Sequence, residues 1–256
     1  MSDHLPGHLS AITQARLTLG PRRRTQDTRT ALAFALDHAR AREAVLSELD
    51  VDGLATTLAV ADLSHDVVTS AAGSRDTYIR RPDLGRRLSP EDRARLTPQE
   101  PCDVALVLGD GLSAIAVALN GAAFMVALAN KLGACGLGTS DVILARQARV
   151  ALGDDIAQAL GAQTVVMALG ERPGLSAADS LGVYITKNPT ATTPDSARNC
   201  LSNIREAGLP VADAAHQATT LIKAMRAFGG SGVALNTALQ KNRRLDGDDS
   251  ASPHRL

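Results

Sequence analysis

The sequence has few aromatic residues and no tryptophan. Aromatic residues make up 2% of its 256 positions. A core without large rings relies on Ala, Leu, Val and Ile, and a surface without rings offers no platform for stacking bases. Lys and Arg balance Asp and Glu at 27 each, so the formal net charge is zero. We therefore expect no nucleic-acid partner.

Cysteine is scarce as well. Cys102, Cys135 and Cys200 are odd in number and form no Cys-x-x-Cys pair, so neither a disulfide framework nor a metal site is predicted. This cysteine usage fits a reducing cytosol. No apolar run approaches the ~20 residues of a membrane span, and residues 1–19 lack a signal-peptide core. We expect a cytoplasmic protein that does not bind membranes.

The common motifs of nucleotide-binding enzymes and hydrolases are missing. There is no G-x-G-x-x-G fingerprint, no Walker A sequence and no nucleophile elbow. The loop Gly109-Asp-Gly-Leu-Ser113 follows a predicted strand, and its glycines and the amides of the next helix are able to cradle an anion. No complete catalytic apparatus is visible, so no catalytic residue is assigned.

From Asp103 onward, short apolar runs alternate with amphipathic segments. Strands are predicted at residues 104–108, 142–145, 164–168 and 183–186. Helices are predicted at residues 114–132, 154–160, 196–207 and 211–228. This β-α-β rhythm is typical of a parallel sheet. We predict an α/β protein whose residues 101–240 form a Rossmann-like parallel-sheet domain.

The remainder of the chain has a different pattern. Residues 28–49 carry an apolar stripe near helical spacing, which predicts a surface-packing helix. Pro90 to Pro101, rich in Pro and charge, is the predicted linker. Residues 1–100 are thus expected to be a smaller, mainly helical segment with a linker. The polar residues 241–256 are predicted to be a disordered tail.

The most informative stretch is Ala168-Leu-Gly-Glu-Arg-Pro-Gly-Leu175, which follows the apolar run 164–167. It lies at the carboxyl edge of the predicted sheet, where ligands bind in open α/β folds. Gly170 and Gly174 allow a ligand to approach the backbone closely. Glu171 then faces a crevice. The alternative is an ordinary turn in which Glu171 is solvated.

Three sequence words, taken in chain order, resemble the small (light) subunit of ethanolamine ammonia-lyase. They are Arg81-Pro-Asp-Leu-Gly-Arg-Arg-Leu88, Gly170-Glu-Arg-Pro-Gly-Leu175 and Arg198-Asn-Cys-Leu-Ser-Asn-Ile204. Weaker matches include Gly20-Pro-Arg-Arg-Arg-Thr-Gln26 and Asp37-His-Ala-Arg-Ala-Arg42. The matching words extend over residues 8 to 236, which is most of the chain.

The resemblance implies a carbon–nitrogen lyase that depends on adenosylcobalamin and is active only as a complex with a large subunit. That enzyme converts ethanolamine to acetaldehyde and ammonia by radical chemistry, which the cofactor carries. The family pattern places the substrate site chiefly in the large subunit, cobalamin between the subunits, and several copies of each in a hetero-oligomer. Some members are enclosed in a bacterial microcompartment, and the resemblance leaves that location open here.

Val150, Glu171 and Cys200 match cobalamin-binding positions of that family, residue by residue. A carboxylate accepts hydrogen bonds from the amide side chains of a corrin, and Val150 supplies backbone or apolar contact. Cys200 has two further interpretations. It is either a packing residue or a nucleophile whose pKa the start of the predicted helix 196–207 lowers.

Two rival functions belong to other classes. One is an assembly module that docks an enzyme without contacting a cofactor, and the other is an independent α/β enzyme that uses Cys200 as its nucleophile. The arginines Arg22 to Arg24 and those between Arg80 and Arg87 are able to bind phosphates or partner carboxylates. The sequence leaves open whether these arginines contact a ligand, lie at an interface with the large subunit or form a solvated face.

Overall fold

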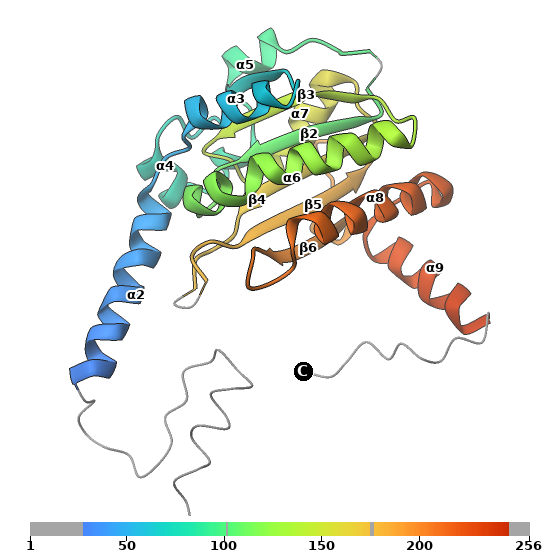
Figure 1. Ribbon diagram of the computed structural model, residues 1–256. Coiled ribbons are helices and arrows are strands. Elements are labelled where there is room, and N and C mark those ends of the chain that lie inside the picture. The colour runs from blue at the N-terminus through green and yellow to red at the C-terminus, as the bar shows by residue number, and fades with distance from the viewer. Residues whose placement is uncertain (1–27, 101, 175–176, 246–256) are drawn as a thin grey trace, which may run out of the picture.

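The computed structural model describes residues 28–100, 102–174 and 177–245 (Figure 1). The helices and strands follow in the order α2 (Thr28–Leu46), α3 (Val51–Val60), β1 (His65–Thr69), α4 (Arg75–Arg80), η1 (Leu84–Arg86), α5 (Pro90–Arg95), β2 (Val104–Gly109), α6 (Ala114–Ala134), β3 (Thr139–Arg146), α7 (Leu152–Leu160), β4 (Thr164–Gly170), β5 (Leu181–Lys187), η2 (Asp195–Ala197), β6 (Arg198–Ile204), α8 (Val211–Phe228) and α9 (Gly232–Leu245).

The strands form one six-stranded mixed sheet in the order β1-β3-β2-β4-β5-β6. The first four strands of this order are parallel, whereas β5 and β6 are antiparallel to their neighbours. The predicted α/β class is confirmed, but the all-parallel sheet of a Rossmann-like domain is wrong. Residues 171–180, which join β4 to β5, are fewer than the dozen or so that a parallel crossover needs.

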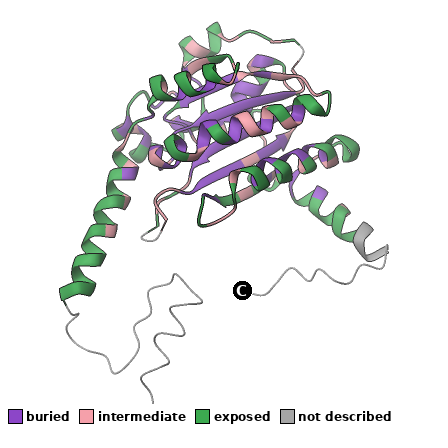
Figure 2. Cartoon of the chain, in the orientation of Figure 1, coloured by how far each residue is buried: buried purple, intermediate pink, exposed green. Residues whose placement is uncertain are grey.

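Helices cover the two faces of the sheet unequally. On one face α3, α6 and α8 bury the larger apolar cluster, in which α6 contributes Phe124, Met125 and Leu128. On the other face α7 buries a smaller cluster around Ile156. The central strands β2 and β4 are buried throughout because both faces are covered there (Figure 2). This explains their continuous apolar runs.

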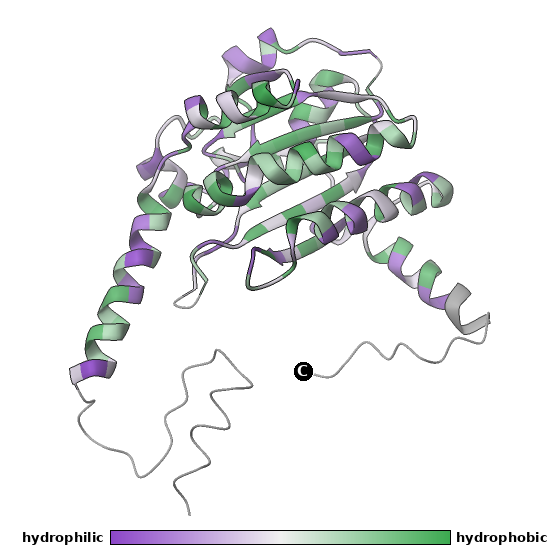
Figure 3. Ribbon diagram, in the orientation of Figure 1, coloured by the Kyte–Doolittle hydropathy of each residue, from purple (hydrophilic) through white to green (hydrophobic). Residues whose placement is uncertain are grey.

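Helix α6 is apolar along most of its length (Figure 3). Among residues 28–100, 102–174 and 177–245 it is the one helix long and apolar enough to cross a membrane by length and composition. Half of its most apolar window is buried inside the protein. It packs on the sheet and on α8, as the core helix of an α/β domain does.

The part of the chain before residue 101 is mainly helical where it is described, but it also adds β1 to the sheet. Part of the predicted linker is the helix α5, whose cap Ser89 accepts a hydrogen bond from the amide of Asp92. Arg95 in turn binds Asp66 of β1 at 2.6 Å. The division of the chain near residues 100 and 240 stays a prediction. Helix α9 continues to Leu245, and residues 246–256 lie outside the described part.

The helix predicted over residues 196–207 is wrong. Residues 198–204 form the edge strand β6, in which Cys200 pairs with Tyr184 of β5. The strand has few β-branched or aromatic residues, so its extended structure depends on pairing with β5 and not on local preference. The other helices and strands predicted from Asp103 onward, together with the helix in residues 28–49, are confirmed; α8 has the predicted ends, and the others differ by a few residues.

Candidate ligand groove

The α7 side of the sheet is left uncovered at β5 and β6. Val183 and Ile185 of β5 are buried on the opposite side, whereas Tyr184 packs toward the α7 side. A groove of about 700 Å³ lies there. It is lined by Tyr184 and Cys200 from the sheet, by Arg149 and Val150 from the turn before α7, and by residues near Arg86. The sheet itself therefore forms part of a solvent-accessible site.

A smaller hollow of about 230 Å³ adjoins this groove, since Arg149, Val150 and Tyr184 line both. Glu171 lines the smaller hollow, just beyond the end of β4. We call the two hollows together the sheet-edge groove. The structure thus brings Val150, Glu171 and Cys200, which are far apart in the sequence, to one groove. Cys200 lies in the middle of β6, and Val150 and Glu171 lie just beyond the carboxyl ends of β3 and β4. This is the edge at which open α/β sheets bind ligands.

Glu171 is fixed by its neighbours and is not the solvated residue of an ordinary turn. Its Oε2 accepts hydrogen bonds from the hydroxyl of Ser180 and from the amide of Asn203, the latter at 3.2 Å. Its Oε1 lies over Gly182, where a Cβ would be only 2.9 Å away. In the described part of the chain, Oε1 accepts no hydrogen bond from another residue. One oxygen therefore holds the site together, and the other is available to a ligand.

Cys200 lies within β6 and not at a helix N-terminus, so no helix dipole lowers its pKa. Although the residue is exposed, the groove desolvates its thiol and raises the pKa, and the charge of Glu171 acts in the same direction. A hydrogen bond with Tyr184 opposes this shift without reversing it. Desolvation also raises the pKa of Tyr184 to about 12. Both groups stay protonated at neutral pH, which disfavours a thiolate nucleophile.

We expect iodoacetamide to alkylate Cys200 at neutral pH more slowly than it alkylates a cysteine in an unstructured peptide. Only the thiolate reacts, and each unit by which the pKa is raised lowers its fraction about tenfold. Mass spectrometry of a variant with Cys102→Ser and Cys135→Ser isolates the modification of Cys200. A rate equal to that of the peptide, or faster, would contradict the protonated thiol and revive the nucleophile.

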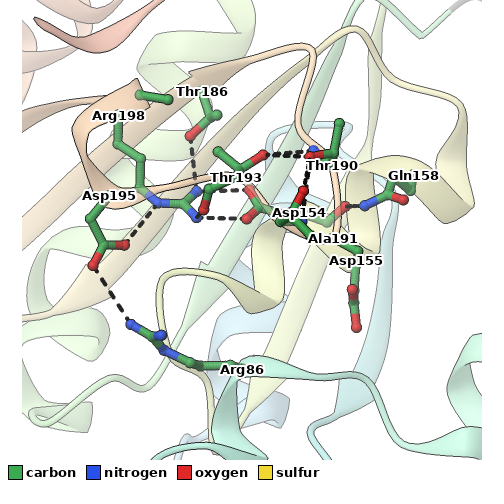
Figure 4. A network of polar contacts seen from close by, with 12 residues as sticks. Arg86, Asp154, Asp155, Gln158, Thr186, Thr190, Ala191, Thr193, Asp195 and Arg198 are labelled. Carbon is green, nitrogen blue, oxygen red and sulfur yellow. Dashed lines mark hydrogen bonds and ion pairs between the residues drawn. The ribbon is translucent and has the colours of Figure 1, made fainter.

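One end of the groove is built on a buried ion pair (Figure 4). Arg198 donates to both carboxylate oxygens of Asp154, at 2.7 and 2.6 Å, and both side chains are 4% exposed. Arg198 also donates to the hydroxyl of Thr186 at 3.2 Å. Asp195 lies 3.4 Å from Arg198 and 3.7 Å from Arg86, which borders the groove. This network joins α7, β5 and β6 behind the ligand-facing surface.

Sequence reasoning missed Tyr184 and Arg198 as members of the site. The chain has two tyrosines, and both line the groove, Tyr78 in the smaller hollow and Tyr184 in both. Because the chain has so few aromatic residues, the position of each tyrosine was a signal that sequence reasoning could have used. Arg198 opens the third family-like word, but its ion pair with Asp154 depends on the fold.

The described arginines between Arg80 and Arg87 all lie within ion-pair distance of a carboxylate of this chain, Arg86 of Asp195 at 3.7 Å. Arg80 pairs with Asp76, Arg81 with Asp83 and Arg87 with Asp155. Arg86 borders the groove. Arg22 to Arg24 lie outside the described residues. Within the described ranges, no group of three or more His, Cys, Asp or Glu side chains is placed to hold a metal ion.

Together, the fold and the groove define an α/β protein that presents an open, ligand-sized groove at the carboxyl edge of a mixed sheet. Residues 5–236 match the family model described as "Ethanolamine ammonia-lyase light chain (EutC)". The chain belongs to this family, as the three sequence words predicted.

Curated relatives agree with the family match over nearly the full length of both chains. The ethanolamine ammonia-lyase small subunit of Bradyrhizobium diazoefficiens is 46% identical, with 89% of this chain and 88% of the relative covered. The small subunit of Pseudomonas fluorescens strain SBW25 is 41% identical, with 94% and 88% covered. That of Azotobacter vinelandii is 40% identical, with 98% and 96% covered.

Proposed function

We propose that this chain is the small subunit of an adenosylcobalamin-dependent ethanolamine ammonia-lyase and that its sheet-edge groove binds one side of the cofactor. The observation that carries the proposal is the convergence of Val150, Glu171 and Cys200 on one groove. In the sequence they are separated by more than twenty residues, and only the fold brings them together.

The donors and acceptors in the groove fit the edge of a corrin. Its amide side chains need both hydrogen-bond acceptors and donors, and Glu171 Oε1 and the half-exposed Arg86 supply one of each. Val150 and Tyr184 supply apolar contact beside them. The groove is open on one side, so a broad planar ligand leaves its other face for a second chain. This arrangement supports a cofactor bound between this subunit and the large one.

In this proposal the residues of this chain bind and orient the cofactor and carry no step on the substrate. When bound, adenosylcobalamin supplies the carbon radical on which the conversion of ethanolamine to acetaldehyde and ammonia depends. The large subunit contributes the substrate site, and several copies of each subunit form the complex. The proposal includes a cytoplasmic location, with enclosure in a microcompartment left open.

Glu171→Gln is expected to weaken cobalamin binding by the complex with the large subunit about ten- to a hundredfold. The change removes the charge from an acceptor, and hydrogen bonds to charged groups contribute about 1.5–3 kcal/mol. The affinity follows from titration of the complex with adenosylcobalamin, monitored by its visible absorbance.

The matched control is Glu91→Gln on the exposed side of α5, which should leave the affinity unchanged. Association of the two subunits should be the same for both variants. If Glu171→Gln binds cobalamin as tightly as the unaltered complex, the groove is not the cofactor site. The assembly module would then be the better interpretation.

A further inference from the structure

The turn of residues 147–150, between β3 and α7, presents Arg149 and Val150 to both hollows of the groove. It begins in an unusual backbone conformation, since Gln147 has φ of +56°, in the left-handed region that residues other than glycine seldom adopt. Such a conformation persists only where surrounding groups hold it. The groove therefore depends on what holds this turn.

The main support is the carboxylate of Asp110, which is fully buried. Its Oδ2 accepts the amide N–H of Gln147 and its Oδ1 accepts that of Ala148, both at 2.8 Å. Hydrogen bonds to a charged acceptor are among the strongest that a backbone amide makes. Burial raises the pKa of Asp110, whereas these amides and the nearby Arg75 favour its charged form. The loop Gly109–Ser113 thus supplies an acceptor to backbone amides and does not cradle an external anion.

Two further bonds hold the turn from the other side. The hydroxyl of Tyr78 donates to the carbonyl of Ala148 at 3.0 Å, and the amide of Arg149 donates to the carbonyl of Gly85 at 2.8 Å. A Cβ at Gly85 would lie 2.9 Å from side-chain carbons of Arg149 and Tyr78, so only glycine fits there. This contact gives a physical reason for the glycine in the word Arg81–Leu88.

Arg75 lies beside Asp110 and favours its charged form. Its Nη1 lies 3.4 Å from Asp110 Oδ2 and donates to the carbonyl of Gly111 at 2.9 Å, and the side chain is 7% exposed. Two guanidinium groups lie over the ring of Tyr78, that of Arg75 at 4.8 Å and that of Arg149 at 4.3 Å from its centre. Asp110, Arg75 and Tyr78 thus form one packed support beneath the turn.

We propose that Asp110, supported by Arg75 and Tyr78, is a positioning residue for cobalamin binding because it fixes the turn that carries Arg149 and Val150. The inference rests on the proposed function of the groove. Asp110 itself is fully buried and acts through the turn, so it needs no contact with the ligand.

Asp110→Asn tests this role with little change in shape. An asparagine oxygen accepts one of the two amides, but its NH2 group faces the other amide and cannot accept it. We expect faster hydrogen exchange in peptides that cover residues 147–150, and at least tenfold weaker adenosylcobalamin binding by the complex with the large subunit. Exchange and absorbance titration measure the two effects separately from turnover.

The matched control is Asp103→Asn. Asp103 also accepts a backbone amide, that of Gly138 at 3.0 Å, and pairs with Arg226 at 2.7 Å, but it lies at the amino edge of the sheet. This variant should leave both the exchange at residues 147–150 and the cobalamin affinity unchanged. A merely structural role of Asp110 would make the two variants alike in affinity.

Tyr78→Phe provides a milder second test if Asp110→Asn does not fold. It removes one hydrogen bond to the turn and keeps the ring, so we expect a severalfold loss of cobalamin affinity. Unchanged affinity in the folded variant, or unchanged exchange at residues 147–150, would overturn the positioning role. If the unaltered complex binds no cobalamin, the proposed function fails, whereas the exchange data still decide whether Asp110 holds the turn.

Discussion

Replacing Asp154 with alanine is expected to lower the free energy of unfolding by about 3–5 kcal/mol, as removing one partner of a buried ion pair does. The side chain of Arg198 is 4% exposed and donates two hydrogen bonds to the carboxylate of Asp154 (Figure 4). Without that carboxylate, a buried guanidinium keeps its charge and loses its main acceptor. The cost is large because solvent cannot reach the group to replace the lost bonds.

Urea unfolding of the full chain, followed by circular dichroism, measures this change. The control is Asp195→Ala. It removes a second carboxylate that pairs with the same guanidinium, but this carboxylate is 76% exposed and lies 3.4 Å away. Exposed pairs contribute less than about 1 kcal/mol, so this variant should unfold almost like the unaltered chain. Equal losses in the two variants would show that burial of the pair does not determine its contribution.

Gly170→Ala is the second substitution with a large expected effect, a loss of at least about 3 kcal/mol or failure to fold. A Cβ at this position would overlap the carbonyl oxygen of Ser113 and lie 2.8 Å from that of Asp110. Both neighbours are backbone atoms that no rotamer change moves away. The amide of Leu112 also donates to the carbonyl of Gly170 at 2.9 Å, so the two loops cannot separate without losing this bond.

Gly133→Ala provides the matched control. Gly133 lies within α6, and a Cβ there would meet nothing within 4 Å. Alanine is favoured over glycine in helices by about 0.5–1 kcal/mol, so this variant should be as stable as the unaltered chain or slightly more stable. Thermal unfolding of both variants gives the comparison. If the Gly170→Ala protein unfolds at the same temperature as the control, the close approach of the two loops is refuted.

The parts of the fold that sequence patterns predicted are those whose environment is uniform. β2 and β4 lie between two covered faces, so their residues are apolar without interruption. β6 was misassigned because it is an edge strand that mixes Asn199, Ser202 and Asn203 with few apolar residues. Its extended structure depends on pairing with β5, which is a tertiary interaction that local sequence does not encode. The antiparallel direction of β5 was predictable, since the connection of residues 171–180 is too short for a helical crossover.

The candidate site divides in a similar way. Val150, Glu171 and Cys200 came from family resemblance, and the fold brings them to one groove. Sequence periodicity did not reveal the hydrogen bonds that hold the turn carrying Val150 in place. The bonds of Asp110 to the turn at residues 147–148 join segments 37 and 38 positions apart, and no local pattern encodes that distance.

The most direct test of the proposed function is acetaldehyde production from ethanolamine by this chain mixed with the matching large subunit and adenosylcobalamin. We predict turnover only when all three components are present, and none from this chain with the cofactor alone. If the two chains associate and bind cobalamin but never produce acetaldehyde, or if the large subunit turns over at the full rate without this chain, the proposed role as a lyase subunit is contradicted.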